Sequence, residues 1–160
     1  MAIELLRIDW TKLQPFTQVL TQAESQEGGL YAMFRLERSV INLYYIGKSI
    51  DFYKRSSTHM NYASHLIPDK DIKKYSVTFG IISSFEQSRL SHSVSPEQLK
   101  DAESFYINFY KPIGNSESTK KGYKGHTIIS FNTGKCFQKH KVISNSDILI
   151  KFLKFYKKNI

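Results

Sequence analysis

Two short aromatic-rich runs are the clearest feature of the hydrophobic pattern. Residues 29–35 (GLYAMFR) and 41–46 (INLYYI) are rich in Tyr, Phe, Met, Ile and Leu, and a polar patch at residues 36–40 separates them. Runs this short, beside glycine, predict the two strands of an antiparallel hairpin. Residues 77–82 (VTFGII) predict a third, buried strand.

Two helices are predicted beside these strands. Asp51 is a suitable N-cap for a helix over residues 52–65. Ser95 and Gln98 can form a capping box at the start of a helix over residues 97–110. Together these elements predict an α/β (α+β) fold, in which a three-stranded, mainly antiparallel central sheet is flanked by helices.

Both ends of the chain are predicted to add helices. Apolar residues at roughly helical spacing between residues 10 and 20 predict an amphipathic helix, in which Pro15 lies in the first turn or breaks it. Residues 127–131 predict a short strand and residues 148–156 a final basic amphipathic helix. The predicted organisation is an N-terminal helical extension (1–26), a central domain (27–116) and a basic C-terminal extension with a terminal helix (117–160).

Charge changes this picture at the C-terminal end. The 160 residues carry a net charge of +9. Residues 1–115 hold 13 Lys and Arg against 12 Asp and Glu, whereas residues 116–160 hold 10 Lys against 2 acidic residues. A basic segment beside a nearly neutral domain predicts a polyanionic partner, most simply the phosphates of a nucleic acid. A solvated lysine face that aids solubility is the alternative.

The remaining composition bounds the compartment. Cys136 is the only cysteine, so no intrachain disulfide can form and nothing indicates secretion. No stretch approaches the ~20 apolar residues that a bilayer crossing requires. The first apolar run contains Glu4 and Asp9, unlike a signal peptide. We therefore expect a cytoplasmic protein without a membrane partner.

Candidate chemistry gathers around the predicted hairpin. Tyr31 and Tyr45 each lie close to a glycine, where the missing side chain lets another backbone or a ligand approach. Arg55 and His59 are one turn apart on the same face of the predicted helix, and Lys48 lies between the second strand and that helix. We expect these five side chains to converge.

A carboxylate on the second helix is a further candidate. Glu103 lies on the apolar stripe of the helix over residues 97–110. Because an unpaired buried carboxylate is costly, a glutamate in this position usually meets a cation. The pattern leaves two interpretations open, a metal ligand or a glutamate at the edge of the stripe that reaches solvent.

These residues carry a resemblance to a known family. The chain resembles the GIY-YIG endonucleases through an ordered set of motif residues: Gly29-Leu30-Tyr31, Tyr45-Ile46-Gly47, Arg55, Glu103 and Asn115. The resemblance covers about residues 27–116, and the ordered set is far more specific than either tripeptide. Leu30 replaces the usual isoleucine. Thirteen residues separate the two motif tyrosines, which is more than the family usually has and predicts a longer hairpin turn.

The resemblance implies a metal-dependent endonuclease that hydrolyses DNA phosphodiester bonds, in a restriction-type or a phage- or mobile-element-type role. Glu103 would bind Mg²⁺ (or Mn²⁺), and DNA would be the partner, with a homodimer as one way to cut both strands. The implied catalytic residues are Tyr31, Tyr45, Arg55, His59 and Glu103, and the implied substrate-binding residues are Lys48 and Asn115. Nearby cations would lower the pKa of a tyrosine so that it could act as the base, and either motif tyrosine is a candidate.

Other function classes remain open or are excluded by spacing. The fold could be a nucleic-acid-binding module without turnover, or a protein-interaction domain. Only phosphate binding should weaken steeply between about 50 and 200 mM salt. Gly47-Lys48-Ser49 is not a P-loop, because Asn42 stands where glycine is needed. His126, Cys136 and His140 lack a fourth ligand and the usual spacing of a zinc site.

Overall fold

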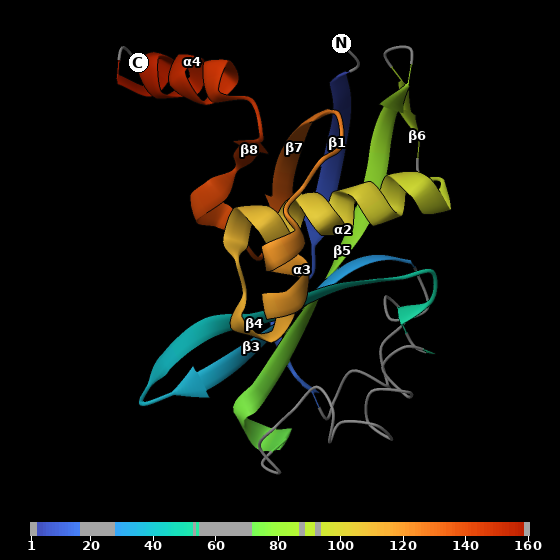
Figure 1. The fold of residues 1–160 in the computed structure, drawn as a ribbon. Coiled ribbons are helices and arrows are strands. Elements are labelled where there is room, and N and C mark those ends of the chain that lie inside the picture. Colours follow the sequence, from blue (N-terminus) through green and yellow to red (C-terminus); the bar gives the residue numbers. More distant parts are fainter. Residues whose placement is uncertain are drawn as a thin grey trace.

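The structure is a computed structural model that describes residues 3–16, 28–52, 54, 72–86, 89–91 and 94–158. In this part of the chain, three helices accompany one large sheet, namely α2 (Pro96–Tyr110), α3 (Ser116–Lys121) and α4 (Asp147–Lys158) (Figure 1). Short 3-10 turns lie at η3 (Ile72–Lys74), η4 (Ile113–Asn115) and η5 (Gln138–His140). The fold is therefore α+β, as the sequence predicts.

The sheet is mixed and strongly curled, like half of a barrel. Its six main strands have the order β4-β3-β5-β1-β7-β8, and two short strands, β2 and β6, also pair with β5. The strands are β1 (Ile3–Trp10), β2 (Gln14–Pro15), β3 (Gly29–Glu37), β4 (Val40–Ser49), β5 (Tyr75–Glu86), β6 (Arg89–Ser91), β7 (Thr127–Gly134) and β8 (Val142–Ser144). β1 and β7 are parallel, and the other pairs are antiparallel. The three predicted strands are confirmed as β3, β4 and β5, but β1, β7 and β8 extend the sheet, so the prediction of a three-stranded sheet is wrong.

The hairpin of β3 and β4 closes with a tight turn. Glu37 pairs with Val40, and the two residues between them, Arg38 and Ser39, have φ angles of 47° and 69°. Two positive φ angles give a turn whose twist matches that of the flanking strands. The predicted longer turn is therefore wrong. The extra residues between the motif tyrosines lengthen the strands instead.

The N-terminal segment forms the strand β1, and the helix predicted between residues 10 and 20 is not present in the described residues 10–16. β1 lies between β5 and β7, which pair with its two edges. Leu6, Ile8 and Trp10 are buried at alternate positions, which is the period of a strand. Trp10 and Phe16 are buried in separate clusters, so they do not share one helix face. The predicted helix is wrong as far as Phe16, and its remainder lies outside the described residues.

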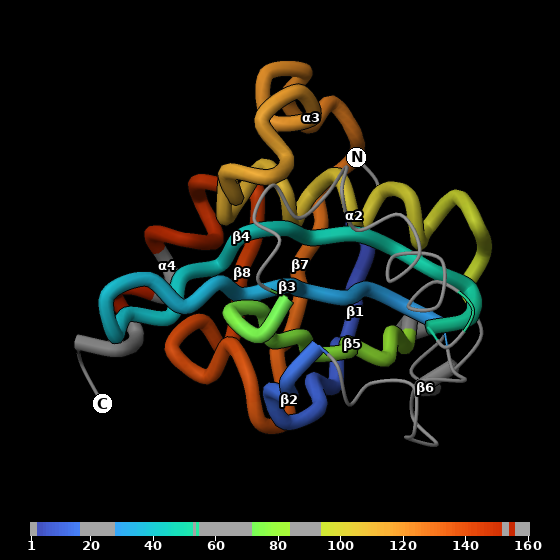
Figure 2. Tube along the Cα trace, turned by 90° about the horizontal axis from the view of Figure 1, so that it is seen from below, coloured from blue at the N-terminus to red at the C-terminus, as the bar shows by residue number. Residues whose placement is uncertain are grey.

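The sheet has an apolar cluster on each face. Helix α2 packs on one face, where Leu99, Ala102 and Phe105 contribute to the larger cluster together with residues of the strands. The second cluster includes Tyr31, Phe52 and residues of β5. Figure 2 shows α2 and α3 on one side of the β3–β4 pair, whereas β2 lies on the other side. Helix α2 begins with the predicted capping box, because Ser95 and Gln98 exchange both hydrogen bonds.

A buried polar network links β1, β7 and α2. The side-chain Oδ1 of Asn132 accepts hydrogen bonds from Trp10 Nε1 at 2.8 Å and from the Tyr106 hydroxyl at 2.6 Å. Asn132 Nδ2 donates to the His140 carbonyl at 2.7 Å. Burial raises the pKa of Tyr106, so its hydroxyl stays protonated and can donate at neutral pH. Asn132 thus satisfies polar groups from three elements at once.

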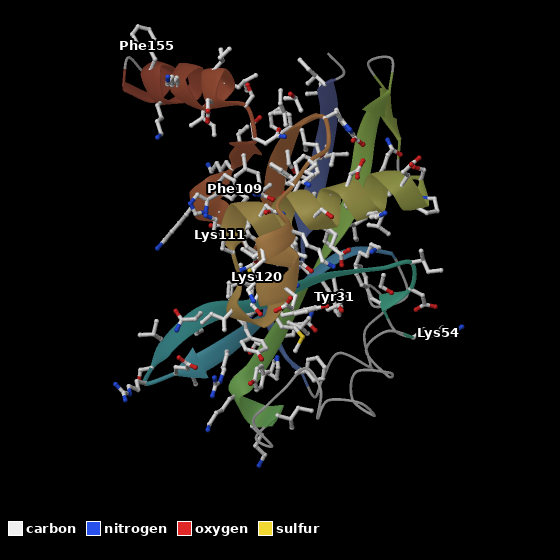
Figure 3. The ribbon with its side chains drawn as sticks, viewed as in Figure 1. Tyr31, Lys54, Phe109, Lys111, Lys120 and Phe155 are labelled. Atoms are coloured by element: carbon white, nitrogen blue, oxygen red, sulfur yellow. The ribbon has the colours of Figure 1, made fainter. Side chains whose placement is uncertain are left out.

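The C-terminal part confirms a strand and a helix. β7 includes the predicted strand at residues 127–131, and α4 includes the predicted helix at residues 148–156. Phe155 is 68% exposed and projects from α4 away from the sheet (Figure 3). Among the helices that the structure describes, none has the length and apolar content that a membrane crossing needs.

Candidate active site

The side chain of Tyr31 lies across Gly47 of the neighbouring strand. The two residues are cross-strand partners in the β3–β4 pair. A Cβ atom at Gly47 would lie 2.5 Å from both Cζ and Oη of Tyr31, so a glycine is required for the ring to lie there. Tyr31 is only 3% exposed, inside the fold (Figure 3). The glycine of the second tripeptide therefore positions the tyrosine of the first.

Regular strand alternation places a second tyrosine on the same face, next to a β-bulge. Met33 pairs with Tyr45 and Phe34 pairs with Leu43, which leaves Tyr44 as the extra residue of β4. After this irregularity Tyr45 packs with the cluster that contains Tyr31. The two motif rings have their centroids 6.0 Å apart. The predicted convergence of the two motif phenols is therefore present.

Replacing Gly47 with alanine tests this packing. We expect Gly47→Ala to lower the free energy of unfolding by about 2 kcal/mol, because the new methyl group must displace the Tyr31 ring. Urea unfolding measures the change. In a Tyr31→Ala background the same substitution should cost far less, since the ring that it displaces is gone. Equal costs in the two backgrounds would contradict the contact.

Glu103 binds Lys48 with both of its carboxylate oxygens. Lys48 Nζ lies 2.6 Å from Oε2, and the backbone N–H of Lys48 donates to Oε1 at 3.1 Å. The Glu103 side chain is 19% exposed, and that of Lys48 is 37% exposed. The expected cation beside Glu103 is thus supplied by the protein. This pair fixes α2 against the end of β4.

Asn115 holds the outer edge of β4. Its Oδ1 accepts from the Ile46 backbone N–H, and its Nδ2 donates to the Ile46 carbonyl, both at 2.8 Å. The buried Asn115 amide therefore makes the two hydrogen bonds that a neighbouring strand would make. The preceding Gly114 approaches so closely that a Cβ there would lie 2.8 Å from the Tyr44 carbonyl oxygen. Asn115 acts on the backbone between Tyr45 and Gly47.

Three of the motif residues line one small pocket. The pocket has a volume of about 150 Å³ and is lined by Tyr45, Glu103, Ser104, Ile107, Asn108, Asn115, Ser118, Lys121 and Gly122. A wider pocket of about 380 Å³, lined by Lys48 and Ser49 among others, lies beside Glu103. Glu103 therefore lies at the wall between two pockets.

The pocket includes polar residues that the sequence reasoning missed. Ser104 and Asn108 are one turn apart on α2, and Asn108 Nδ2 donates to the Ser104 carbonyl at 2.8 Å. Helical spacing could have identified this polar pair next to Glu103. Ser118 and Lys121 come from α3, and no local pattern in the sequence distinguished them.

Two predicted site residues cannot be placed. Arg55 and His59 lie outside the described residues, as does most of the helix predicted over residues 52–65. Its start is described: Asp51 Oδ1 accepts from the Lys54 backbone N–H at 2.9 Å, which is the predicted N-cap interaction. The chain therefore leaves β4 into a capped turn directly after the Lys48 backbone.

The chain matches no model of a known protein family, no curated protein and no solved structure.

Three other tyrosines are unsuited to act as bases. Burial raises the pKa of Tyr106 and of Tyr110. Burial, with a smaller contribution from the Asp101 and Glu4 carboxylates, raises the pKa of Tyr123 to about 12. These phenols therefore stay protonated at neutral pH, where a base must accept a proton.

The donor set fits a weakly held hard cation. In the described ranges, no three His, Cys, Asp or Glu side chains group so that they could bind a metal ion together. Mg²⁺ is commonly held by one or two carboxylates, with waters and phosphate oxygens as the other ligands. Glu103 provides one carboxylate beside two pockets. An ion there would share or replace the contact with the Lys48 ammonium.

Proposed function

We propose that the protein is a metal-dependent endonuclease of the GIY-YIG type, which hydrolyses DNA phosphodiester bonds. One observation carries the proposal. Tyr45 from β4, Glu103 from α2 and Asn115 from η4, which are far apart in the sequence, line a single pocket. The order of the motif residues in the sequence and the basic C-terminal segment support the same function.

The roles follow from exposure and contacts. Glu103 would hold Mg²⁺ or Mn²⁺, which when bound supplies positive charge for the phosphate and the leaving oxygen. Lys48, whose ammonium forms an ion pair with the Glu103 carboxylate, provides a second positive charge for the phosphate. Asn115 holds β4 in place through the Ile46 backbone, and we treat it as a positioning residue.

We assign the base to Tyr45. Tyr45 lines the pocket and is partly exposed, whereas Tyr31 is only 3% exposed. The buried Tyr31 ring instead packs on Tyr45 and sets its position. By the resemblance, Arg55 would bind a phosphate oxygen and His59 would relay a proton or contact the phosphate.

One contact favours a second candidate function, a nucleic-acid-binding module without turnover. Lys48 engages both oxygens of Glu103. If Lys48 keeps this carboxylate from a metal ion, the site binds a phosphate and does not cleave it.

Cleavage of supercoiled plasmid DNA tests the proposal. We expect nicked or linear product with Mg²⁺ and none with EDTA. Tyr45→Phe should lower the cleavage rate by about 10²-fold, because general-base catalysis contributes about 10² to 10⁴. Tyr44→Phe is the matched control: this neighbour is the bulged residue and lines neither of the two pockets at Glu103. It should stay within about twofold of wild type.

Three results would count against the proposal. Equal losses in the two tyrosine variants would point to a damaged β4 rather than to a missing base. Cleavage that is unaffected by EDTA would exclude the metal-dependent mechanism. Salt-sensitive DNA binding with no cleavage under any divalent metal would favour the binding module.

A further inference from the structure

The end of the β3–β4 hairpin extends beyond the rest of the sheet. The last pair between β3 and β5 joins Arg35 to Tyr75. Beyond it, the described strands pair residues 36–37 only with residues 40–41 of the same hairpin. We call residues 36–41 the arm. Figure 1 shows it projecting at the lower left, at the far end of β4 from Lys48.

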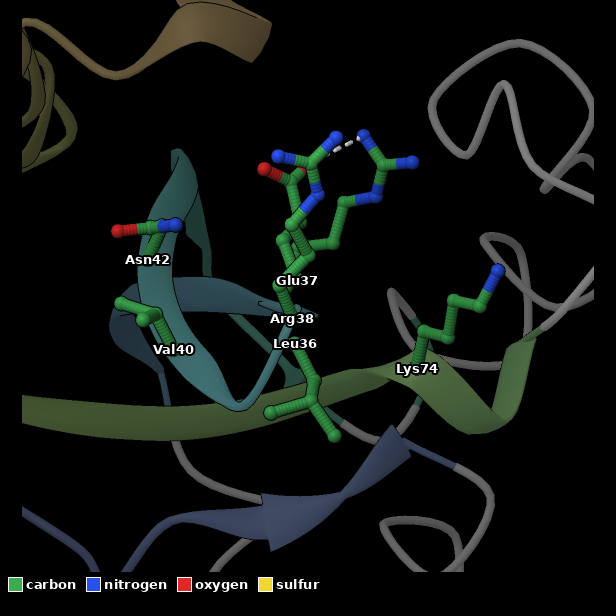
Figure 4. Close-up of a pocket in the computed structure, with 7 residues that line it drawn as sticks. Leu36, Glu37, Arg38, Val40, Asn42 and Lys74 are labelled. Atoms are coloured by element: carbon green, nitrogen blue, oxygen red, sulfur yellow. Dashed lines mark ion pairs between the residues drawn. The ribbon is translucent and has the colours of Figure 1, made fainter.

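One side of the arm forms an open cationic pocket. The pocket has a volume of about 600 Å³ and is lined by Arg35, Leu36, Glu37, Arg38, Val40, Asn42 and Lys74 (Figure 4). Its charged side chains are three cations and one carboxylate. That carboxylate is engaged, since Glu37 Oε1 lies 2.7 Å from Nη1 of Arg35. The lining therefore keeps a net positive charge, and the amide of Asn42 adds hydrogen-bonding capacity.

The turn places an arginine at the tip of the arm. Arg38 is exposed and has a φ of 47°, in the left-handed region where glycine or asparagine would be less strained. Lys74 reaches the same pocket from η3, which is a different part of the chain. Two segments thus supply cations to one open surface. A phosphate-bearing backbone matches its charge and its openness.

We propose that the arm binds backbone phosphates of the DNA beside the cleaved bond, with Arg38 and Lys74 as the main contacts. This inference rests on the proposed nuclease function. The partners of Val40 and Tyr45, Glu37 and Met33, are four positions apart along β3, which corresponds to about 14 Å of strand. With β4 aligned along the duplex, at about 3.4 Å per base pair, the arm meets the backbone about four base pairs from the scissile phosphate. The arm therefore increases affinity without reading sequence.

Salt-dependent binding in EDTA tests the arm, because no metal-dependent cleavage interferes. The probe is a fluorescein-labelled duplex of 30 base pairs, followed by anisotropy. The variant is Arg38→Asn combined with Lys74→Gln, and the asparagine suits the positive φ angle, so the turn is kept. Two lost phosphate contacts should weaken binding by about 10-fold at moderate salt. They should also lower the slope of log K against log salt by about 1.8.

Lys12→Gln is the charge control, because Lys12 is exposed between β1 and β2, lies outside the basic C-terminal segment and lines no pocket named above. It should change the slope by less than half as much as the double variant. Once a cut has been mapped on an end-labelled duplex, neutral methylphosphonate linkages about four base pairs away should weaken DNA binding by the wild type. They should leave the double variant unchanged.

The outcomes separate the two proposals. An unchanged slope in the double variant, or a change in the Lys12 control of half that size or more, contradicts DNA binding by the arm and leaves the nuclease proposal intact. DNA binding that depends on the arm, with no cleavage in Mg²⁺, supports phosphate binding by the arm and contradicts the nuclease proposal. A wild-type protein that does not bind the duplex overturns both.

Discussion

Glu103→Gln should lower the rate of Mg²⁺-dependent DNA cleavage by about 10³-fold, the largest catalytic effect that we expect. The amide is nearly isosteric with the carboxylate but is neutral, so it holds a divalent cation poorly and offers only one acceptor oxygen. Loss of the metal's charge stabilisation corresponds to several kcal/mol of barrier. Initial rates on supercoiled plasmid, measured over a range of Mg²⁺ concentrations, give the change.

Glu97→Gln is the matched control, since Glu97 is an exposed glutamate in the first turn of the same helix. It should keep the wild-type rate. Glu103→Gln also releases the ammonium of Lys48, so DNA binding in EDTA should be retained or slightly stronger. Wild-type cleavage by Glu103→Gln would mean that the metal ligand lies elsewhere. Weakened binding in EDTA would show that the substitution damages the binding surface.

Asn132→Ala should lower the free energy of unfolding by about 3 kcal/mol, the largest effect on stability that we expect. The substitution removes the acceptor of Trp10 Nε1 and one partner of the Tyr106 hydroxyl, and it also frees the His140 carbonyl. A buried donor without a partner costs about 1 to 3 kcal/mol. Among the described residues, Asn132 is the acceptor of the Trp10 Nε1–H, and no second acceptor replaces it. Urea denaturation measures the free energy, and a thermal scan should show a midpoint roughly 10 °C lower.

Asn42→Ala serves as its control, because Asn42 is an exposed asparagine in the same sheet. It should change the free energy by less than about 0.5 kcal/mol. A loss of under 1 kcal/mol for Asn132→Ala would contradict the buried network. Cleavage by the folded fraction of Asn132→Ala should be normal, since the network lies away from the pocket at Glu103.

Local signals made much of the central region predictable. The runs that became β3 and β4 are short, rich in aromatic residues and close to glycine, and Ser95 with Gln98 fixes the start of α2 through hydrogen bonds between near neighbours. The turn was harder, because Arg38 and Ser39 adopt positive φ angles without the glycine or asparagine that usually marks such a turn.

Non-local pairing explains what the sequence did not reveal. The alternation in Leu6, Ile8 and Trp10 indicates a strand, but apolar residues after Trp10 also fit helical spacing. Trp10 belongs to a strand because β1 pairs with β7, and this parallel partner lies more than a hundred residues later in the sequence. In the site, the residue type of Glu103 predicted a nearby cation, and only the fold shows that it is Lys48. The placement of Arg55 and His59 remains a prediction.

The parallel pairing of β1 with β7 also sets an order of events during synthesis. β1 leaves the ribosome about 120 residues before its parallel partner Thr127–Gly134. At 5 to 20 residues per second, that delay is on the order of ten seconds. Asn132, which accepts the hydrogen bond from Trp10 Nε1, is synthesised as part of the same segment. A nascent chain therefore holds one edge of β1 without its strand partner until Thr127–Gly134 has been translated.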